Sequence, residues 1–209
     1  MAPKRKLMAL ALALSGLVVG AFVVTDEEAK ANDNTHFQAK NMSVFLHPDE
    51  LVPGAATLIR TNKGIAFKIY TSELEPGANT VWIVIFNKPQ NCAGGPGHCG
   101  PSDLNNPDVQ ASIVYGTGSI VGADGIANFQ GSLDKGSPPD GISVNVPAGT
   151  ANGLRNTLKA DIHLVVRQHG AVSDTGGAVT QLTTFESPAS CLNPGVCKNV
   201  QAVMFDAVE

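Results

Sequence analysis

The segment ADIHLVVRQHG, residues 160–170, holds two of the five histidines of the chain and one of its few arginines. Imidazole and guanidinium groups bind metal ions, carboxylates and other anions. Side chains alternate along an extended strand, so His163, Arg167 and His169 are expected on one face, together with Asp161. The segment is therefore the first candidate for a functional site.

The spacing of these side chains limits what they can form. Along a straight strand His163 and His169 are about 20 Å apart, whereas two ligands of one metal ion lie within about 4 Å of each other. Arg167 and His169 are about 7 Å apart at their Cα atoms and could bind an anion or a carboxylate. A metal ion would need a ligand from another segment, and His98 is the obvious one. The candidate ligand-binding residues are therefore His98, His163, Arg167 and His169.

A simpler interpretation of this face is that it is solvated, with carboxylates on a neighbouring strand balancing its cations. We favour this interpretation, because Asp161 and Arg167 are residue types that are rarely buried. The opposite face, with Ile162, Leu164 and Val166, is expected in the core.

The four cysteines form two local pairs around loops rich in glycine and proline. The sequence predicts the disulfides Cys92–Cys99 and Cys191–Cys197, because an even count in local pairs is typical of exported proteins. A four-cysteine zinc site is the alternative, but zinc ligand pairs usually have closer spacing.

No other motif indicates catalysis or a cofactor. GTGSIVG (116–122) precedes a hairpin rather than a helix, so it lacks the helix N-terminus that a phosphate loop uses. DLNNPD (103–108) has proline at a ligand position of a calcium loop. We predict no catalytic residue, metal ion or cofactor. Trp82 lies in an apolar strand and is expected in the core.

Short runs rich in β-branched residues alternate with turn residues, and convincing amphipathic helices are absent. We predict an all-β protein with a single antiparallel β-sandwich of the Greek-key or immunoglobulin type in residues 32–209. TVWIVIF (80–86) is apolar on both faces and should be a central strand. The other expected strands are 56–60, 65–70, 111–121, 126–133, 142–146, 160–168, 178–185 and 199–205.

The first residues are typical of a secretory signal. Lys4-Arg5-Lys6 precedes an apolar run from Leu7 to Val24, and Ala29-Lys30-Ala31 fits a signal peptidase. We expect cleavage before Asn32, with an uncleaved membrane anchor as the alternative.

The charge balance argues against some partners. The whole chain carries −4, and loss of residues 1–31 removes four basic and three acidic residues, leaving −5. Without a cluster of Lys and Arg we expect neither nucleic acid nor, after cleavage, a membrane as partner.

Three segments resemble a family of exported, uncharacterised prokaryotic β-domain proteins and, more distantly, the CHRD (chordin-type) domain. They are SELEPGANTVWIVIFNKPQNC, VYGTGSIVGADGIANFQGSL and ADIHLVVRQHG. The positions that match CHRD motifs are Leu74, Pro76, Gly77, Ala160, Ile162 and His163. The resemblance implies a secreted β-sandwich and carries over no activity.

Two classes of function follow. The first is a secreted or periplasmic, non-enzymatic domain that binds an extracellular protein or surface polymer, or is structural. The second is a small-site protein, either an enzyme or a carrier of a metal or ligand, that uses the four candidate residues named above. The lack of a catalytic motif favours the first.

Overall fold

The computed structural model describes residues 35–137, 143–144, 153–174, 177–185, 191 and 197–208. The expected signal segment and its cleavage site lie outside these residues. The strands are β1 (His36–Val44), β2 (His47–Arg60), β3 (Gly64–Thr71), β4 (Gly77–Phe86), β5 (Ala111–Val121), β6 (Ala127–Asp134), β7 (Ser143–Val144), β8 (Asp161–Gln168) and β9 (Lys198–Phe205). The helices are α1 (Ala178–Thr183) and three short 3₁₀ turns, η1 (Pro89–Asn91), η2 (Pro101–Asn105) and η3 (Pro107–Val109).

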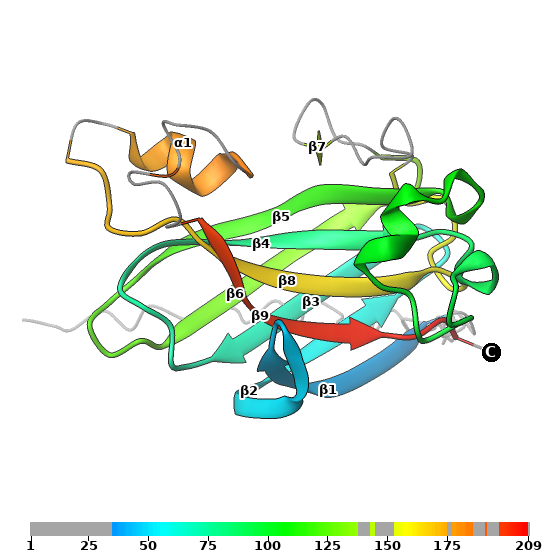
Figure 1. Ribbon diagram of the computed structural model, residues 1–209, viewed down its shortest axis with the longest axis horizontal. Coiled ribbons are helices and arrows are strands. Elements are labelled where there is room, and N and C mark those ends of the chain that lie inside the picture. Colours follow the sequence, from blue (N-terminus) through cyan, green and yellow to red (C-terminus); the bar gives the residue numbers. More distant parts are fainter. Residues whose placement is uncertain are drawn as a thin grey trace, which may run out of the picture. The chain divides into compact units, whose positions relative to one another are not determined.

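All the strands belong to one antiparallel sheet with the order β6-β3-β2-β1-β9-β8-β4-β5-β7. The sheet curls around a common core until β5 and β6 lie side by side, which makes a nearly closed barrel (Figure 1). Strands β3, β6, β5 and β4 then have the spatial order of a Greek key. The prediction of an all-β, antiparallel protein is confirmed. A two-sheet sandwich is not confirmed, because the strands form a single sheet.

Two glycines, Gly131 on β6 and Gly116 on β5, lie where these two strands approach each other. A Cβ atom added at Gly131 of β6 would lie 2.7 Å from the Phe67 ring and 2.9 Å from the carbonyl oxygen of Gly116 on β5. Real Cβ atoms do not come this close to other atoms, so a side chain at Gly131 would push β5 and β6 apart. Closure of the sheet therefore depends on glycine at this point.

The predicted β2–β3 hairpin and the central strand are confirmed. The second predicted hairpin is confirmed only in its turn, because β6 pairs with β3 and β5 pairs with β4 and β7. A tight turn at residues 61–63 joins β2 to β3, and Gly125, with a φ of 67°, lies in the turn between β5 and β6. β4 pairs with both β5 and β8, and of Thr80–Phe86 only Val84 is partly exposed. β1 and the first half of β2 were not predicted. Of the expected strand 142–146, Ser143 and Val144 form β7 and the other residues lie outside the described part.

The prediction of a strand at 178–185 is wrong, because residues 178–183 form the helix α1. The buried Gln181 side chain explains the change. Its Oε1 accepts a hydrogen bond from the backbone N–H of Ser173 at 2.8 Å, and its Nε2 donates to the carbonyl oxygen of Ala171 at 2.8 Å. Strand propensity is a weak preference that such tertiary contacts override.

Both predicted disulfides form. Cys92–Cys99 and Cys191–Cys197 have Cα–Cα distances of 5.2 and 5.4 Å. Each pair closes its own loop, so the four cysteines do not make a common zinc site. No helix in the described part of the chain is long and apolar enough to cross a membrane.

Candidate functional site

The inner face of β8 is in the core, as predicted, with Ile162, Leu164 and Val166 fully buried. The prediction that its outer face is solvated is wrong. Asp161 and His169 are 0% exposed, and Arg167 is 5% exposed. The reason is a second layer that covers this side of the sheet, made of the loop 87–110, α1 and the turn between β1 and β2 (Figure 1).

The four candidate ligand-binding residues do not gather around one centre. His98 is exposed in the loop closed by the first disulfide. His163 is partly buried on β8, and Arg167 and His169 are buried toward the end of that strand. Of the four, only His163 lines the pocket described below.

Arg167 is held by the segment after α1. Its Nε donates to the carbonyl oxygen of Phe185 at 2.8 Å, and its guanidinium carbon lies 4.2 Å from the centre of the Phe185 ring. Its Nη1 donates to the side-chain oxygen of Asn199 at 3.0 Å. These contacts give Arg167 a structural role in fixing the covering layer to the sheet.

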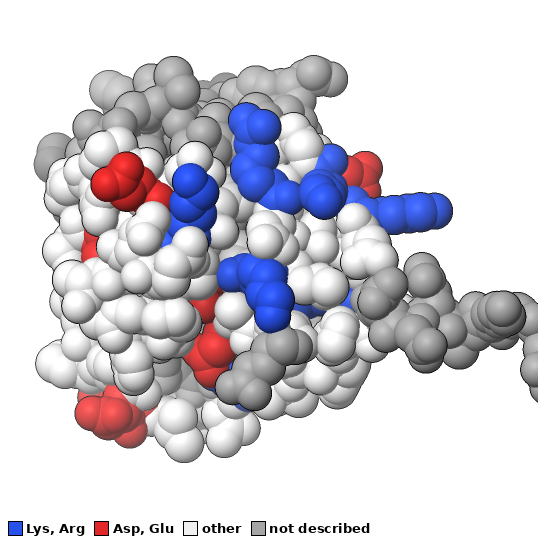
Figure 2. Space-filling model, turned by 90° about the vertical axis from the view of Figure 1, so that its right-hand side faces the viewer, with Lys and Arg blue, Asp and Glu red and all other residues white. Residues whose placement is uncertain are grey.

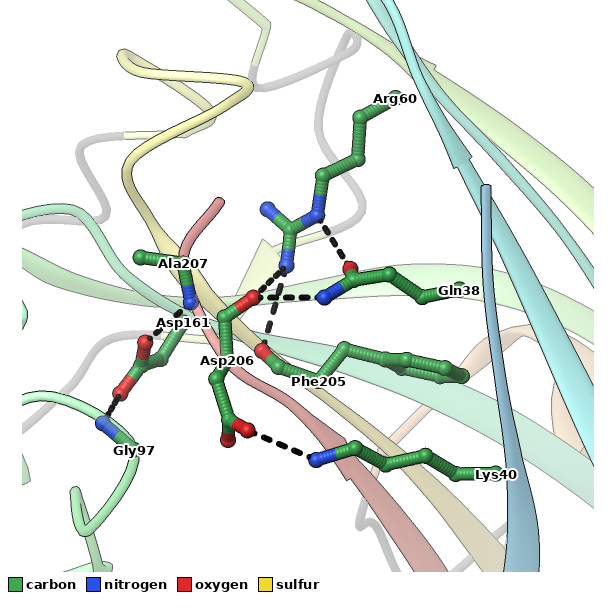
Figure 3. A network of polar contacts seen from close by, with 8 residues as sticks. All are labelled: Gln38, Lys40, Arg60, Gly97, Asp161, Phe205, Asp206 and Ala207. Atoms are coloured by element: carbon green, nitrogen blue, oxygen red, sulfur yellow. Dashed lines mark hydrogen bonds and ion pairs between the residues drawn. The ribbon is translucent and has the colours of Figure 1, made fainter. Parts of the chain in front are cut away.

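Asp161 joins three parts of the chain (Figure 3). One carboxylate oxygen accepts from the backbone N–H of Gly97 at 2.7 Å, and the other accepts from that of Ala207 at 2.9 Å. Burial raises the pKa of Asp161, while these two hydrogen bonds and the charge of Arg60 act in the opposite direction. The side chain fastens the disulfide loop and the C-terminal segment to the start of β8.

Arg60, which the sequence analysis did not single out, is completely buried at the end of β2 (Figure 3). All five of its N–H groups donate hydrogen bonds. The acceptors are the side-chain oxygen of Gln38 at 2.8 Å and the carbonyl oxygens of Thr157, Ala160, Phe205 and Asp206 at 2.8–3.2 Å. Burial lowers the pKa of Arg60 to about 10, so the group is charged at neutral pH.

Between the covering elements and the sheet lies a pocket of about 490 Å³. Its floor is the outer face of β4, β5, β8 and β9, where alternate residues point away from the core. Its lining is apolar except for the side chains of His163 and Asn199. The lining residues are Phe45, Leu46, Pro48, Trp82, Val84, Phe86, Cys99, Gly100, Pro101, Leu104, Ile113, His163, Val165, Phe185, Asn199, Ala202 and Met204.

His163 is the ionisable group of this pocket. Its ring packs against Phe86, with the ring centres 5.0 Å apart. Burial is the main reason that the pKa of His163 falls to about 4; Lys40 lowers it further and Asp206 acts in the opposite direction. The imidazole is therefore neutral at pH 7, and it can donate one hydrogen bond and accept another.

Trp82 is buried, as predicted, and it also forms a wall of the pocket. Its ring meets those of Tyr115 and Phe185 edge-on, at centre distances of 5.6 and 5.0 Å. Its Nε1–H donates to Thr80 Oγ1 at 2.9 Å, and the same oxygen lies 2.8 Å from His169 Nε2. The sequence signal for this wall was the apolar character of both faces of β4, which indicated a cover on the outer side.

On the end of the molecule shown in Figure 2, several Lys and Arg side chains stand near one another in the upper and central part, and Asp and Glu side chains lie mostly to the left and below. No family model, curated protein or solved structure matches this chain.

Proposed function

We propose that this protein is an exported, non-enzymatic binding protein that holds a small, largely apolar molecule in the pocket over β4, β8 and β9. The observation that carries the proposal is a pocket of about 490 Å³ with apolar walls and a neutral histidine in its lining. Small-molecule sites commonly measure about 300–1,000 Å³ and combine apolar walls with a few polar groups.

The lining indicates the chemistry of the ligand. The rings of Trp82, Phe86 and Phe185 offer flat apolar contacts, which suit a planar or branched hydrocarbon body. His163 offers one hydrogen bond to a hydroxyl or carbonyl group without the cost of burying a charge. Asp161 and Arg167 hold the covering layer through their own contacts, and His169 contacts Thr80 on β4, which favours binding over catalysis.

Two features support export. Disulfides persist in oxidising compartments such as the periplasm and the extracellular space, and this chain has two. The N-terminal residues have the order of a secretory signal, and the three segments that resemble a family of exported prokaryotic β-domain proteins point the same way. Intact-mass measurement of exported protein should find a chain that begins at Asn32. Retention of residues 1–31 in a membrane fraction would contradict this.

The pocket can be tested by filling it. Ala202 lies on its floor, so Ala202→Phe places a ring inside it. Ala66, on β3, lies outside the pocket, and Ala66→Phe adds the same ring as a matched control. Native mass spectrometry of exported wild type should detect a bound small molecule. A202F should lose it and A66F should keep it.

A second readout uses an apolar fluorescent probe. Binding of the probe should change the emission of Trp82, the single tryptophan of the chain. We expect saturable binding to wild type and A66F and at least tenfold weaker binding to A202F. Equal binding to A202F and A66F would overturn the proposal.

A further inference from the structure

We propose that His169, Cys191 and Cys197 form a zinc site that is closed while the Cys191–Cys197 disulfide is intact and opens when it is reduced. This site is separate from the proposed ligand pocket. The Nδ1 atom of His169 lies 3.3 Å from Cys197 Sγ. One potential ligand atom from each of the three residues lies within 4.8 Å of the others.

The geometry fits a tetrahedral ion. Zinc binds thiolate sulfur at about 2.3 Å and imidazole nitrogen at about 2.0–2.1 Å, which places neighbouring ligand atoms about 3.3–3.9 Å apart. The nitrogen–sulfur distance is already in this range. Once the S–S bond breaks, the two sulfur atoms need to separate by less than 2 Å to reach it. Two cysteines and one histidine leave a fourth position open.

The hydrogen bond between His169 Nε2 and Thr80 favours the tautomer in which His169 Nδ1 can bind a metal ion. Nε2 lies 2.8 Å from Thr80 Oγ1, which also accepts the Nε1–H of Trp82 at 2.9 Å. A hydroxyl oxygen has two lone pairs, so it can accept a second N–H, from Nε2. In that tautomer Nδ1 carries no proton and faces the sulfur atoms. Metal-binding histidines usually donate their other N–H to such a partner.

Burial separates the two halves of the site. His169 and Thr80 are fully buried, which fixes the ring. Cys191 and Cys197 are only partly buried, so a reductant and an ion can reach them. Soft thiolate ligands together with one imidazole select zinc over calcium or magnesium.

The redox step balances with a dithiol as reductant. The Cys191–Cys197 bond breaks, the dithiol becomes a disulfide, and its two electrons and two protons pass to the two cysteine sulfurs. Zinc binding then releases both protons, because the ligands are thiolates. A disulfide oxidant that takes the two electrons re-forms the bond and expels the ion.

The chain contains a matched control for this site. Cys92–Cys99 closes a loop of similar length, with sequence separations of 7 and 6 for the two disulfides. The double variants C92S/C99S and C191S/C197S therefore each lose one small loop closure. Both are reduced with a phosphine and water, which yields two thiols and a phosphine oxide, and are then titrated with Zn²⁺ by equilibrium dialysis.

We expect reduced C92S/C99S to bind one zinc ion per chain and reduced C191S/C197S to bind none at the same concentration. The oxidised wild type should also bind none. Because the hydrogen-bond chain from His169 through Thr80 reaches Trp82, zinc binding should change the fluorescence of Trp82. Absence of binding to reduced C92S/C99S, or equal binding to both variants, would overturn the proposal.

The role of Thr80 is tested by two substitutions that are less disruptive than loss of the buried histidine. Thr80→Ser keeps the hydroxyl group and Thr80→Val keeps the shape without it. In the C92S/C99S background we expect T80S to bind zinc as the parent does and T80V to bind it about 10–100-fold more weakly. Equal affinities for T80S and T80V would show that His169 is not held as a zinc ligand by this contact.

Discussion

The ring of His163 packs against that of Phe86, with the ring centres 5.0 Å apart and the planes inclined by 59°. The two residues come from neighbouring strands, β8 and β4, and both line the pocket. This environment lowers the pKa of His163 to about 4, chiefly because burial disfavours the charged ring. An ionisable residue thus serves as a neutral part of an apolar surface.

The first prediction is a pH dependence of stability. His163 titrates near pH 6.5 when unfolded and near pH 4 when folded. Its neutral form is present in both states above pH 6.5, so its contribution is complete there. As the pH falls from 6.5 toward 4, the unfolded chain takes up the proton first, and the free energy of unfolding falls by about 1–3 kcal/mol. Chemical denaturation at several pH values measures this loss.

Comparison with His163→Phe isolates the contribution of this group. H163F should keep its stability between pH 6.5 and 4 better than the wild type does, because the ring can no longer take up a proton. His47 is exposed and lies outside the pocket, so His47→Phe should reproduce the wild-type profile. Parallel profiles for wild type and H163F would contradict the assignment.

A second prediction contrasts the two faces of β8. Leu164 is fully buried in the core, so Leu164→Ala should cost about 2–5 kcal/mol of unfolding free energy. His163→Ala should cost much less, about 0–1 kcal/mol, because its ring borders an open pocket and its removal leaves no closed cavity in the core. A loss for H163A as large as that for L164A would show that the ring is a packed core group instead.

The elements that depend on local pattern could be predicted from the sequence. Alternation placed Ile162, Leu164 and Val166 in the core, and turn residues located the β2–β3 hairpin and the turn between β5 and β6. The disulfides followed from paired cysteines around short loops. Each of these inferences needs only residues that are near one another in the chain.

The outer face of the sheet depends on contacts between distant segments, so local pattern did not reveal it. Asp161 and Arg167 would indicate solvent on a bare strand, but distant backbone groups of Gly97 and Phe185 complete their hydrogen bonds. From the sequence Arg60 was only the last residue of an expected strand, although its five acceptors come from three separate parts of the chain. The pocket exists only because the loop 87–110, α1 and the turn between β1 and β2 cover this face of the sheet.

A third prediction concerns Arg60. Arg60→Met removes the buried charge and leaves five acceptors without their donors, so it should cost about 3–5 kcal/mol of unfolding free energy. Lys63 is exposed in the adjacent turn, and Lys63→Met should stay within about 0.5 kcal/mol of wild type. Urea denaturation of both variants checks this. A loss for R60M no larger than that for K63M would mean that water satisfies the same acceptors.

The last prediction concerns Asp161, whose two carboxylate oxygens each accept a backbone N–H, from Gly97 and Ala207. Asp161→Asn replaces one acceptor with an NH₂ donor, so one of these N–H groups would face another donor. The change should cost about 1–3 kcal/mol and loosen the loop 87–110, which forms one wall of the pocket. Asp124→Asn is the control, because an Asp124 oxygen accepts one N–H, from Ile126, and asparagine can still accept it.

Hydrogen exchange gives the sharper measurement, because the Gly97 and Ala207 amides report on this side chain directly. In D161N we expect faster exchange of at least one of the two amides, together with weaker binding of the apolar probe, since the loop supplies Cys99, Pro101 and Leu104 to the pocket. D124N should exchange as wild type does at both positions. If D161N lost stability while both amides kept their protection, the carboxylate would not be what holds the loop to β8, and the pocket wall would have to depend on the disulfide and its apolar contacts alone.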